Sequence, residues 1–390
     1  MRNPTVALPG ALCLALLLLP ISFLTPSSAA QKSQLVVHEW GTFTSVTNKD
    51  GLDLSWRPLH VESDLPSFIY SIDKGGSRRD YDYPSKSLRP VRVRMETPVL
   101  YFYAKEQMTA TVRVLFPGGK VTEWYPQGRH FDGGIGWIQL KIMPDLRVEL
   151  AHDAKENHYY PARETDAAML EVAGKDHPEY ERFLFYRGVG NFALPLSLKL
   201  QGNKVTIKNT SGHSLSNAIL FENTGGQIGF SLLSVPRDNT TIDRPVLDKQ
   251  INNLRQEMKT MLVTNGLYEK EADAMLNTWR DSWFEEGLRI FYIMPREDTD
   301  AILPLSIEPQ PDSLVRVLVG RTELITPEME RNVTSQLPKL SDQSPAVRAA
   351  ARKEINRYGR FVESILSQVS AKATDPEIRN AAIRLMQEIN

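Results

Sequence analysis

The chain has very little cysteine: one residue, Cys13, among 390. Cys13 lies in an apolar stretch, residues 10–19, that follows the lone charge of Arg2 and precedes the small residues Ser28-Ala29-Ala30. This order is typical of an export signal, and it predicts cleavage after Ala30 and a secreted or periplasmic protein. The mature chain would then have no cysteine, which excludes disulfides, zinc–thiolate sites and cysteine nucleophiles.

Long apolar runs, a large net charge and familiar catalytic motifs are also absent. The N-terminal stretch is shorter than the roughly 20 residues of a membrane span, so no stable span is expected after cleavage. Loss of Arg2 leaves 45 basic and 47 acidic residues, a net charge of −2 that gives no general attraction to nucleic acid. There is no phosphate loop, dinucleotide fingerprint or serine-hydrolase elbow. The expected ligand is therefore a small molecule, a glycan or a protein, and no cofactor is assigned.

From Gln31 to about Pro236 the chain has mostly the periodicity of β-strands. The segments "IQLKI" (138–142) and "LPLSLKL" (194–200) alternate apolar and polar residues, as half-buried strands do. Gly202-Asn203 separates two such runs, and "FPGGKVTEWY" (116–125) reads as a second hairpin turn. Turns recur at the spacing of antiparallel sheets. We predict a mainly β fold with α: an antiparallel, β-sandwich-like core.

Helical periodicity replaces the strand pattern in two places. Apolar residues recur at three- and four-residue steps within 246–286, which predicts an inserted helical pair. The same spacing follows Ser344-Pro345, a typical helix start. The predicted organisation is a signal peptide (1–30), a β-rich core domain (31–326) with the helical insertion 246–286, and a helical C-terminal tail (327–390) appended to the core.

The first predicted strand, "LVVHEWGTFTSV" (35–46), contains candidate ligand-binding residues. Strand alternation places His38 and Trp40 on one face and Glu39 on the other. The zincin motif is rejected because Thr42 stands where its second histidine would be. A glutamate among apolar residues needs a partner, and we predict an ion pair with Arg92 or Arg94. The alternative is a catalytic carboxylate.

A second charged strand is expected in "RPVRVRMETPVLYFY" (89–103). Alternation places Arg92, Arg94 and Glu96 on one face, and apolar residues from Val91 to Val99 on the other. The charged face is interpreted as the solvated side of a sheet. The functional alternative is a groove in which Arg94 and Glu96 bind an anionic or hydroxylated ligand.

Two loop regions supply the remaining candidates. The segment 151–168 is crowded with titratable groups, including Arg163, Glu164 and Asp166. Its spacing matches no known metal-ligand pattern, so a solvated loop is favoured and no metal is assigned. Arg187 precedes a glycine pair in "FYRGVGNF", which suits either close approach of a ligand or a bulge.

The segments "HEWGTFTSV", "RMETPVLYFY" and "SWFEEGLRIFYIMPR" resemble those of a family of uncharacterised exported bacterial proteins. The resemblance implies export and a shared fold, and it transfers no catalytic role. Two hypotheses follow: a binding or structural protein of the bacterial envelope, or an extracytoplasmic hydrolase that uses carboxylates, with or without a metal. A cluster that unites Glu39, Glu96 and the loop 152–166 would favour the hydrolase.

Overall fold

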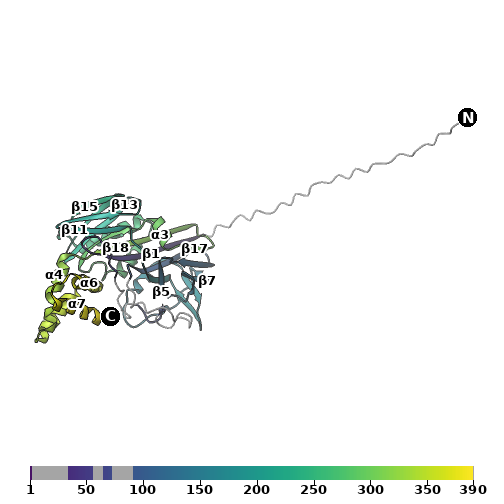
Figure 1. Ribbon diagram of the computed structural model, residues 1–390. Helices are drawn as coiled ribbons and strands as arrows, with labels where there is room; N and C mark the ends of the chain where they lie inside the picture. Colours follow the sequence, from purple (N-terminus) through teal and green to yellow (C-terminus); the bar gives the residue numbers. More distant parts are fainter. Residues whose placement is uncertain (2–33, 56–64, 73–90, 390) are drawn as a thin grey trace. The chain divides into compact units, whose positions relative to one another are not determined.

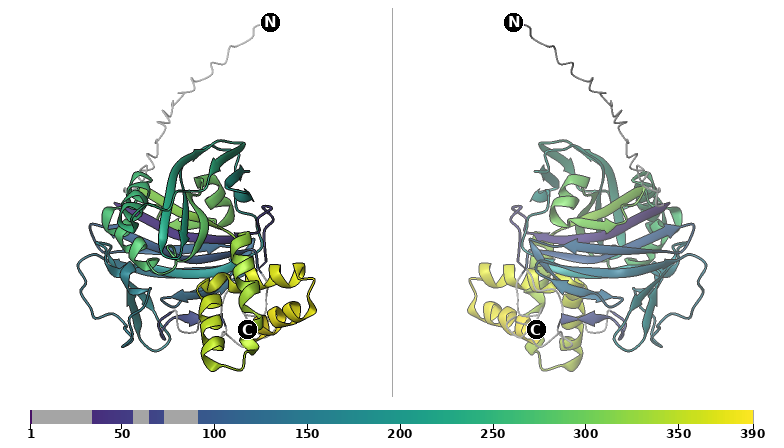
Figure 2. Two further views of the ribbon diagram at one scale, coloured as in Figure 1. Left: turned by 90° about the vertical axis from the view of Figure 1, so that its left-hand side faces the viewer. Right: turned by 90° about the vertical axis from the view of Figure 1, so that its right-hand side faces the viewer.

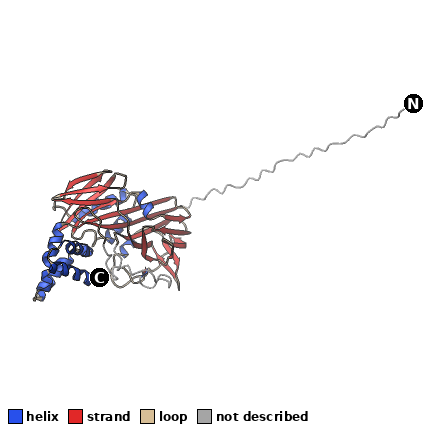
Figure 3. Cartoon of the chain, viewed as in Figure 1, coloured by secondary structure: helices blue, strands red, loops and turns tan. Residues whose placement is uncertain are grey.

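Strands account for most of the regular structure, and the longest of them form a single large sheet in the computed structural model (Figures 1 and 3). The structure describes Met1 and residues 34–55, 65–72 and 91–389. The predicted signal peptide, residues 1–30, therefore lies outside the described ranges apart from its first residue. The described residues from Gln34 onwards belong to one compact unit.

The large sheet has nine strands, and its centre is the charged first strand of the sequence. In spatial order they are β14 (Gln227–Val235), β13 (Leu215–Thr224), β16 (Gly287–Ile293), β18 (Ser313–Leu324), β1 (Leu35–Thr47), β3 (Val93–Ala104), β10 (Leu184–Gly190), β5 (Gly119–Tyr125) and β2 (Tyr70–Ser71). All neighbours are antiparallel except β1 and β18, which are parallel.

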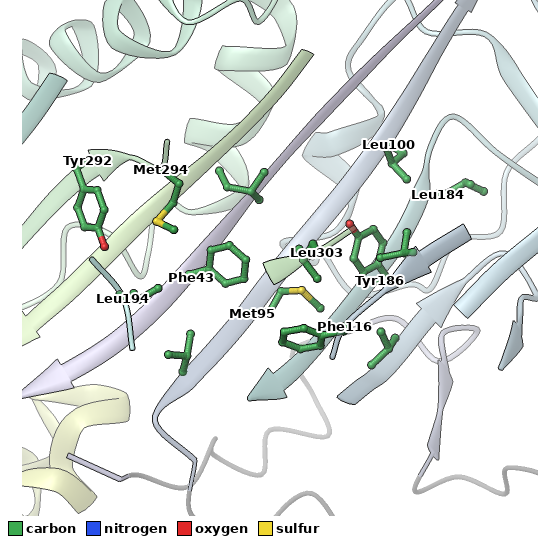
Figure 4. Packing of buried hydrophobic residues seen from close by; sticks show 14 of the residues in the cluster. Phe43, Met95, Leu100, Phe116, Leu184, Tyr186, Leu194, Tyr292, Met294 and Leu303 are labelled. Carbon is green, nitrogen blue, oxygen red and sulfur yellow. The ribbon is translucent and has the colours of Figure 1, made fainter. Parts of the chain in front are cut away.

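Two smaller antiparallel sheets face one side of the large sheet. One consists of β17 (Leu305–Glu308), β4 (Met108–Leu115), β7 (Gly134–Met143), β8 (Met169–Ala173), β9 (Pro178–Glu181) and β6 (Arg129–Phe131). The other consists of β11 (Leu196–Gln201), β12 (Lys204–Asn209) and β15 (Asn239–Asp243). Apolar side chains from all three sheets form a shared core, in which Phe43, Met95 and Tyr186 of the large sheet pack near Phe116 (Figure 4). This arrangement confirms the predicted sandwich-like core.

Helices cover the opposite face of the large sheet. The predicted helical pair is α1 (Ile251–Thr264) and α2 (Glu269–Thr278), and it packs with the 3-10 helix η3 (Tyr160–Arg163) over a second apolar core. The C-terminal helices are α4 (Pro327–Gln336), η4 (Pro338–Ser341), α5 (Pro345–Asn356), η5 (Gly359–Phe361), α6 (Val362–Lys372) and α7 (Pro376–Ile389), seen in yellow-green to yellow in Figure 2. A short helix, α3 (Arg296–Ile302), precedes β17.

The C-terminal helices have their own apolar core, which reaches the large sheet. Val46 of β1 and Ile325, just after β18, pack in it with residues such as Ile355 and Ile365. The helical run after Pro345 is interrupted at Gly359, whose φ of +51° lies in the left-handed region that favours glycine. The chain therefore turns sharply at this point, and the turn brings η5 towards the sheet.

Two local predictions are wrong. The segment 116–125 is not a hairpin, because β4 and β5 belong to different sheets and the turn between them crosses the sandwich. Val99 was expected on the face opposite to Arg94, but the two residues share a face. The reason is a β-bulge in β3, opposite residues Trp40–Thr42 of β1, which shifts the alternation of side chains by one residue. The hairpin at Gly202 is confirmed, since Gln201 pairs directly with Lys204.

None of the helices in the described ranges combines the length and apolar content needed to cross a bilayer.

Candidate functional site

A cavity of about 310 Å³ lies where the large sheet, the end of α2 and the turn before α6 meet, and we call it the arginine cavity. Its volume is at the small end of the range for sites that bind small molecules. The described residues that line it are Leu65, Arg94, Glu96, Thr97, His158, Tyr159, Arg187, Thr278, Trp279, Ser282, Glu285, Gly359 and Arg360.

The sheet wall of the cavity is shaped by the bulge in β3. Thr97 has a φ of +49°, a left-handed conformation that is unfavourable for a β-branched residue. Such strained positions persist only where the surrounding structure holds them, and they gather at functional sites. Here the bulge directs Arg94 and Glu96 towards the helices, on the same face as Arg187 of the adjacent strand β10.

A continuous chain of ion pairs reaches the cavity, which its members Glu285, Arg360, Glu96 and Arg94 line. In order, its members are Arg289, Glu323, Arg321, Glu285, Arg360, Glu96 and Arg94. The N···O distance is 2.5 Å between Arg289 and Glu323 and 2.9 Å between Arg321 and Glu285. Each of the three carboxylates in this chain contacts two guanidinium groups.

Glu96 contacts two arginines of this chain, Arg360 and Arg94. It is 1% exposed, and burial alone would raise its pKa. The neighbouring charges of Arg360 and Arg94 outweigh that effect, so the pKa of Glu96 falls to about 2. Thr44 donates a hydrogen bond of 2.8 Å to its second oxygen. Glu96 therefore stays ionised at neutral pH, and it is a poor proton donor there.

The helical wall presents three polar groups that have no hydrogen-bond partner among the described residues. They are the Thr278 hydroxyl, the indole N–H of Trp279 and the Ser282 hydroxyl, on residues that are 2%, 8% and 8% exposed. Buried polar groups are satisfied in the great majority of cases, and leaving one unpaired costs about 1–3 kcal/mol. All three residues line the same cavity.

The C-terminal helices complete the cavity through η5. Arg360 donates to Glu96 and lies 3.6 Å from Glu285. This approach depends on Gly359, since a Cβ atom there would lie 2.6 Å from a Glu285 oxygen. The second terminal nitrogen of Arg360 makes no hydrogen bond with the described residues, which leaves a donor beside the cavity.

Three of the residues proposed from sequence line this cavity: Arg94, Glu96 and Arg187. Arg187 also pairs with Glu123 of β5, at 3.0 Å. Strand alternation in the sequence predicted that Arg94 and Glu96 share a face. Both residues line the cavity, as the hypothesis of a ligand-binding groove requires.

His38 and Trp40 share one face of β1, as predicted. Helices cover this face, but neither residue lines the cavity. The Nδ1 atom of His38 lies 2.8 Å from a carboxylate oxygen of Glu271 on α2, and both residues are buried. Tyr103 donates to the same carboxylate at 2.8 Å. Trp40 packs in the apolar core under the helical pair. The contact between His38 and Glu271 thus ties α2 to the sheet.

Glu39 points to the other face, into the core between the sheets. It does pair with an arginine, but the predicted partners Arg92 and Arg94 are wrong: the partner is Arg316 of β18. Arg94 lies on the opposite face of the sheet, whereas the parallel register places Arg316 directly beside Glu39. Tyr186 donates a second hydrogen bond to Glu39. Glu39 and Glu96 therefore cannot act on the same substrate atom.

The candidates of the 151–168 segment have separate local roles. Arg163 forms an ion pair of 2.6 Å with buried Glu181 and lies over the rings of Tyr159 and Tyr160. Asp166 is exposed and pairs with Lys270, and Glu164 is exposed. Within the described ranges, no group of three or more potential metal-ligating side chains is close enough to hold an ion.

Several other cavity residues have no functional signal in the sequence. Thr278, Ser282 and Trp279 sit in a stretch whose period indicates only a helix, and Arg360 sits in a tail expected to be an appendage. A weak signal was available in Glu285-Glu286, since anions near the end of a helix are unfavourable and call for a cation nearby. In the structure, Glu285 forms an ion pair with Arg321, and Glu286 forms one with Arg357.

Comparison with known proteins does not assign this chain to a family. No known family model matches the chain, and no characterised protein matches it in sequence. Among solved structures, it is similar to the yeast delta-COP-I mu-homology domain, with 8% identity and a TM-score of 0.30 over 76% of this chain and 97% of that one. The same domain complexed with the Dsl1 WxWxV peptide gives 9% identity and a TM-score of 0.29 over the same shares of the two chains. Overlap at this level is too weak to establish a shared fold or a shared ligand.

Proposed function

We propose that this is an exported binding protein of the bacterial envelope, and that it holds a small polar ligand in the arginine cavity. The observation that carries the proposal is the set of three buried polar groups, on Thr278, Trp279 and Ser282, without partners among the described residues. A ligand that pairs with them would remove a desolvation cost that the unoccupied protein bears. The adjoining ion-pair chain would hold the sheet side of the cavity rigid for recognition.

The positions and the ionisation of the carboxylates favour a binding function over the alternative of a carboxylate hydrolase. Hydrolysis by paired carboxylates needs two groups near one bond, one of which is protonated. Glu39 lies on the opposite face of the sheet from Glu96. The two carboxylates that line the cavity, Glu96 and Glu285, are both paired with arginines, which hold Glu96 as an anion. His158 and Tyr159 of the loop line the cavity with Glu96, but neither contacts Glu96 by a hydrogen bond.

Export is tested by the mass of the mature protein. We expect the protein recovered from outside the cytoplasm to begin at Gln31, because Ser28-Ala29-Ala30 provides the small residues for cleavage. Intact-mass measurement of the full-length gene product, expressed in a bacterium, identifies the first residue. A protein that retains Met1 and stays in the cytoplasm would contradict the export proposal.

The binding site is tested with two nearly isosteric substitutions, Ser282→Ala and Thr278→Val. Each removes an unpaired buried hydroxyl, so we expect the free energy of unfolding to stay unchanged or to rise by up to about 1 kcal/mol. In a thermal-shift screen with sugars, sugar acids and hydroxy acids, at least one compound should raise the melting temperature of the parent protein. That rise should be reduced or lost in both variants.

Ser364→Ala is the matched control. The Ser364 hydroxyl is also buried without a partner among the described residues, but it lies on α6 and does not line the cavity. This variant should keep the full ligand response. A response equal in all four proteins would place binding elsewhere, and destabilisation by both cavity variants would show that the hydroxyls serve the fold instead.

A further inference from the structure

The large sheet ends on one side at β14, which lacks the features that usually protect an edge strand. Its sequence, QIGFSLLSV, contains no charged residue and no proline. Natural edge strands are usually short, charged, bulged or covered, because an open edge can pair with another chain. Among the described strands, the other edges follow this rule: β2 has 2 residues, and β6, β9, β11, β15 and β17 each contain a charged residue.

The open part of this edge follows Ile228. At Ile228 itself the edge is covered, since the backbone N–H of Lys249 donates to the Ile228 carbonyl at 3.0 Å. The backbone groups of Ile228 therefore point away from β13. Strand alternation directs those of Phe230, Leu232 and Ser234 the same way. No described segment pairs with the edge at these three residues, so their backbone groups are open to a further strand.

The side chain at the centre of the open stretch is apolar and exposed. Leu232 is 55% exposed. It lies on the helical face of the sheet with Phe230, which packs against the core under α1. A groove of about 340 Å³ runs beside it between β14 and α1, and its lining includes Thr260 and Met261. The open backbone is thus flanked by an apolar surface.

We propose that β14 pairs with β14 of a second copy of the protein, antiparallel and across a twofold axis at Leu232. In this register Leu232 lies opposite the partner's Leu232, and Phe230 lies opposite the partner's Ser234. Each of these pairs exchanges two backbone hydrogen bonds, and the two large sheets join into one. Because the strand carries no charge, the two copies meet without like-charge repulsion along it.

The limits of the open edge support a second copy as the partner. Lys249 closes one end at Ile228, and the strand is followed at its other end by Pro236, which has no N–H to donate. In the proposed register Ile228 faces the partner's Pro236, so both limits fall at the same position of the ladder. A twofold interface requires this self-complementarity. No residue of β14 lines the arginine cavity, so this inference is independent of the proposed ligand binding.

Sedimentation velocity of the mature protein, from about 1 μM to about 200 μM, covers the range expected for a small interface. We expect the average mass to rise with concentration from that of one chain towards that of two. Leu232→Lys should keep the protein monomeric, because it places two like charges opposite each other at the twofold axis. Lysine is common on natural edge strands, so the variant should fold, and thermal unfolding checks this.

Ile138→Lys is the matched control. Ile138 is 51% exposed and lies on β7, which has a neighbouring strand on each side. This variant should form the dimer as the parent does.

Hydrogen exchange at single-residue resolution identifies the contact. Exchange of the amides of Phe230, Leu232 and Ser234 should slow as the concentration rises, whereas those of Ser231 and Leu233, which face β13, should be protected at every concentration. The proposal is overturned by a protein that stays monomeric, by a dimer that Leu232→Lys leaves intact or that Ile138→Lys disrupts equally, and by a dimer in which the three outward amides gain no protection.

Discussion

Glu39→Gln is expected to lower the free energy of unfolding by about 3–5 kcal/mol, the usual cost of removing one partner from a buried ion pair. Glu39 and the side chain of Arg316 are both inaccessible to solvent. The substitution leaves Arg316 with one carboxylate, Asp300, which is 46% exposed. Denaturant unfolding of parent and variant at neutral pH measures the difference.

The matched control replaces both partners. Glu39→Met combined with Arg316→Met should recover most of the lost stability, because apolar residues of similar volume often substitute for a buried pair at no net cost. If Glu39→Gln were as stable as the parent, the structural role of Glu39 would be wrong. A catalytic role would then become credible, since catalytic residues are often neutral or unfavourable for stability.

Arg360→Gln is expected to cost about 3 kcal/mol at neutral pH, near the lower end for a broken buried pair because Arg94 remains beside Glu96. The cost should depend on pH. The folded protein lowers the pKa of Glu96 from 4.5 to about 2, so its contribution to stability is full above about pH 4.5 and is lost as the pH falls towards 2. The difference between parent and variant should therefore be constant from pH 7 to 5 and shrink at pH 3.

Arg352→Gln is the control for this prediction. Arg352 on α5 pairs with Glu388 on α7 at 2.9 Å, but both side chains are more than half exposed. Exposed pairs contribute about 0–1 kcal/mol, so this variant should stay close to the parent at every pH. An equal effect of the two substitutions would contradict the role of Arg360 in closing the cavity.

Local periodicity predicted the parts of the fold that depend on local packing. The alternation around Gly202-Asn203 corresponds to β11 and β12, and the helical spacing after Ser344-Pro345 corresponds to α5. The opposite faces of His38 and Glu39 also follow from strand geometry alone. These features are fixed by residues close together in the sequence.

The errors arise where distant segments meet. The partner of Glu39 lies 277 positions away on a strand whose parallel pairing with β1 leaves no local signal. The bulge at Thr97 moves Val99 to the face of Arg94, which strict alternation cannot anticipate. Arg360 reaches Glu96 only because the chain turns at Gly359. Much of the arginine cavity depends on such long-range contacts.

A crystal structure of the mature protein with the compound that raises its melting temperature most in the thermal-shift screen tests the central claim most directly. The account predicts density for one ligand molecule in the arginine cavity, beside Ser282 and Thr278. Clear density for that compound elsewhere on the protein, with the cavity unchanged, would contradict it.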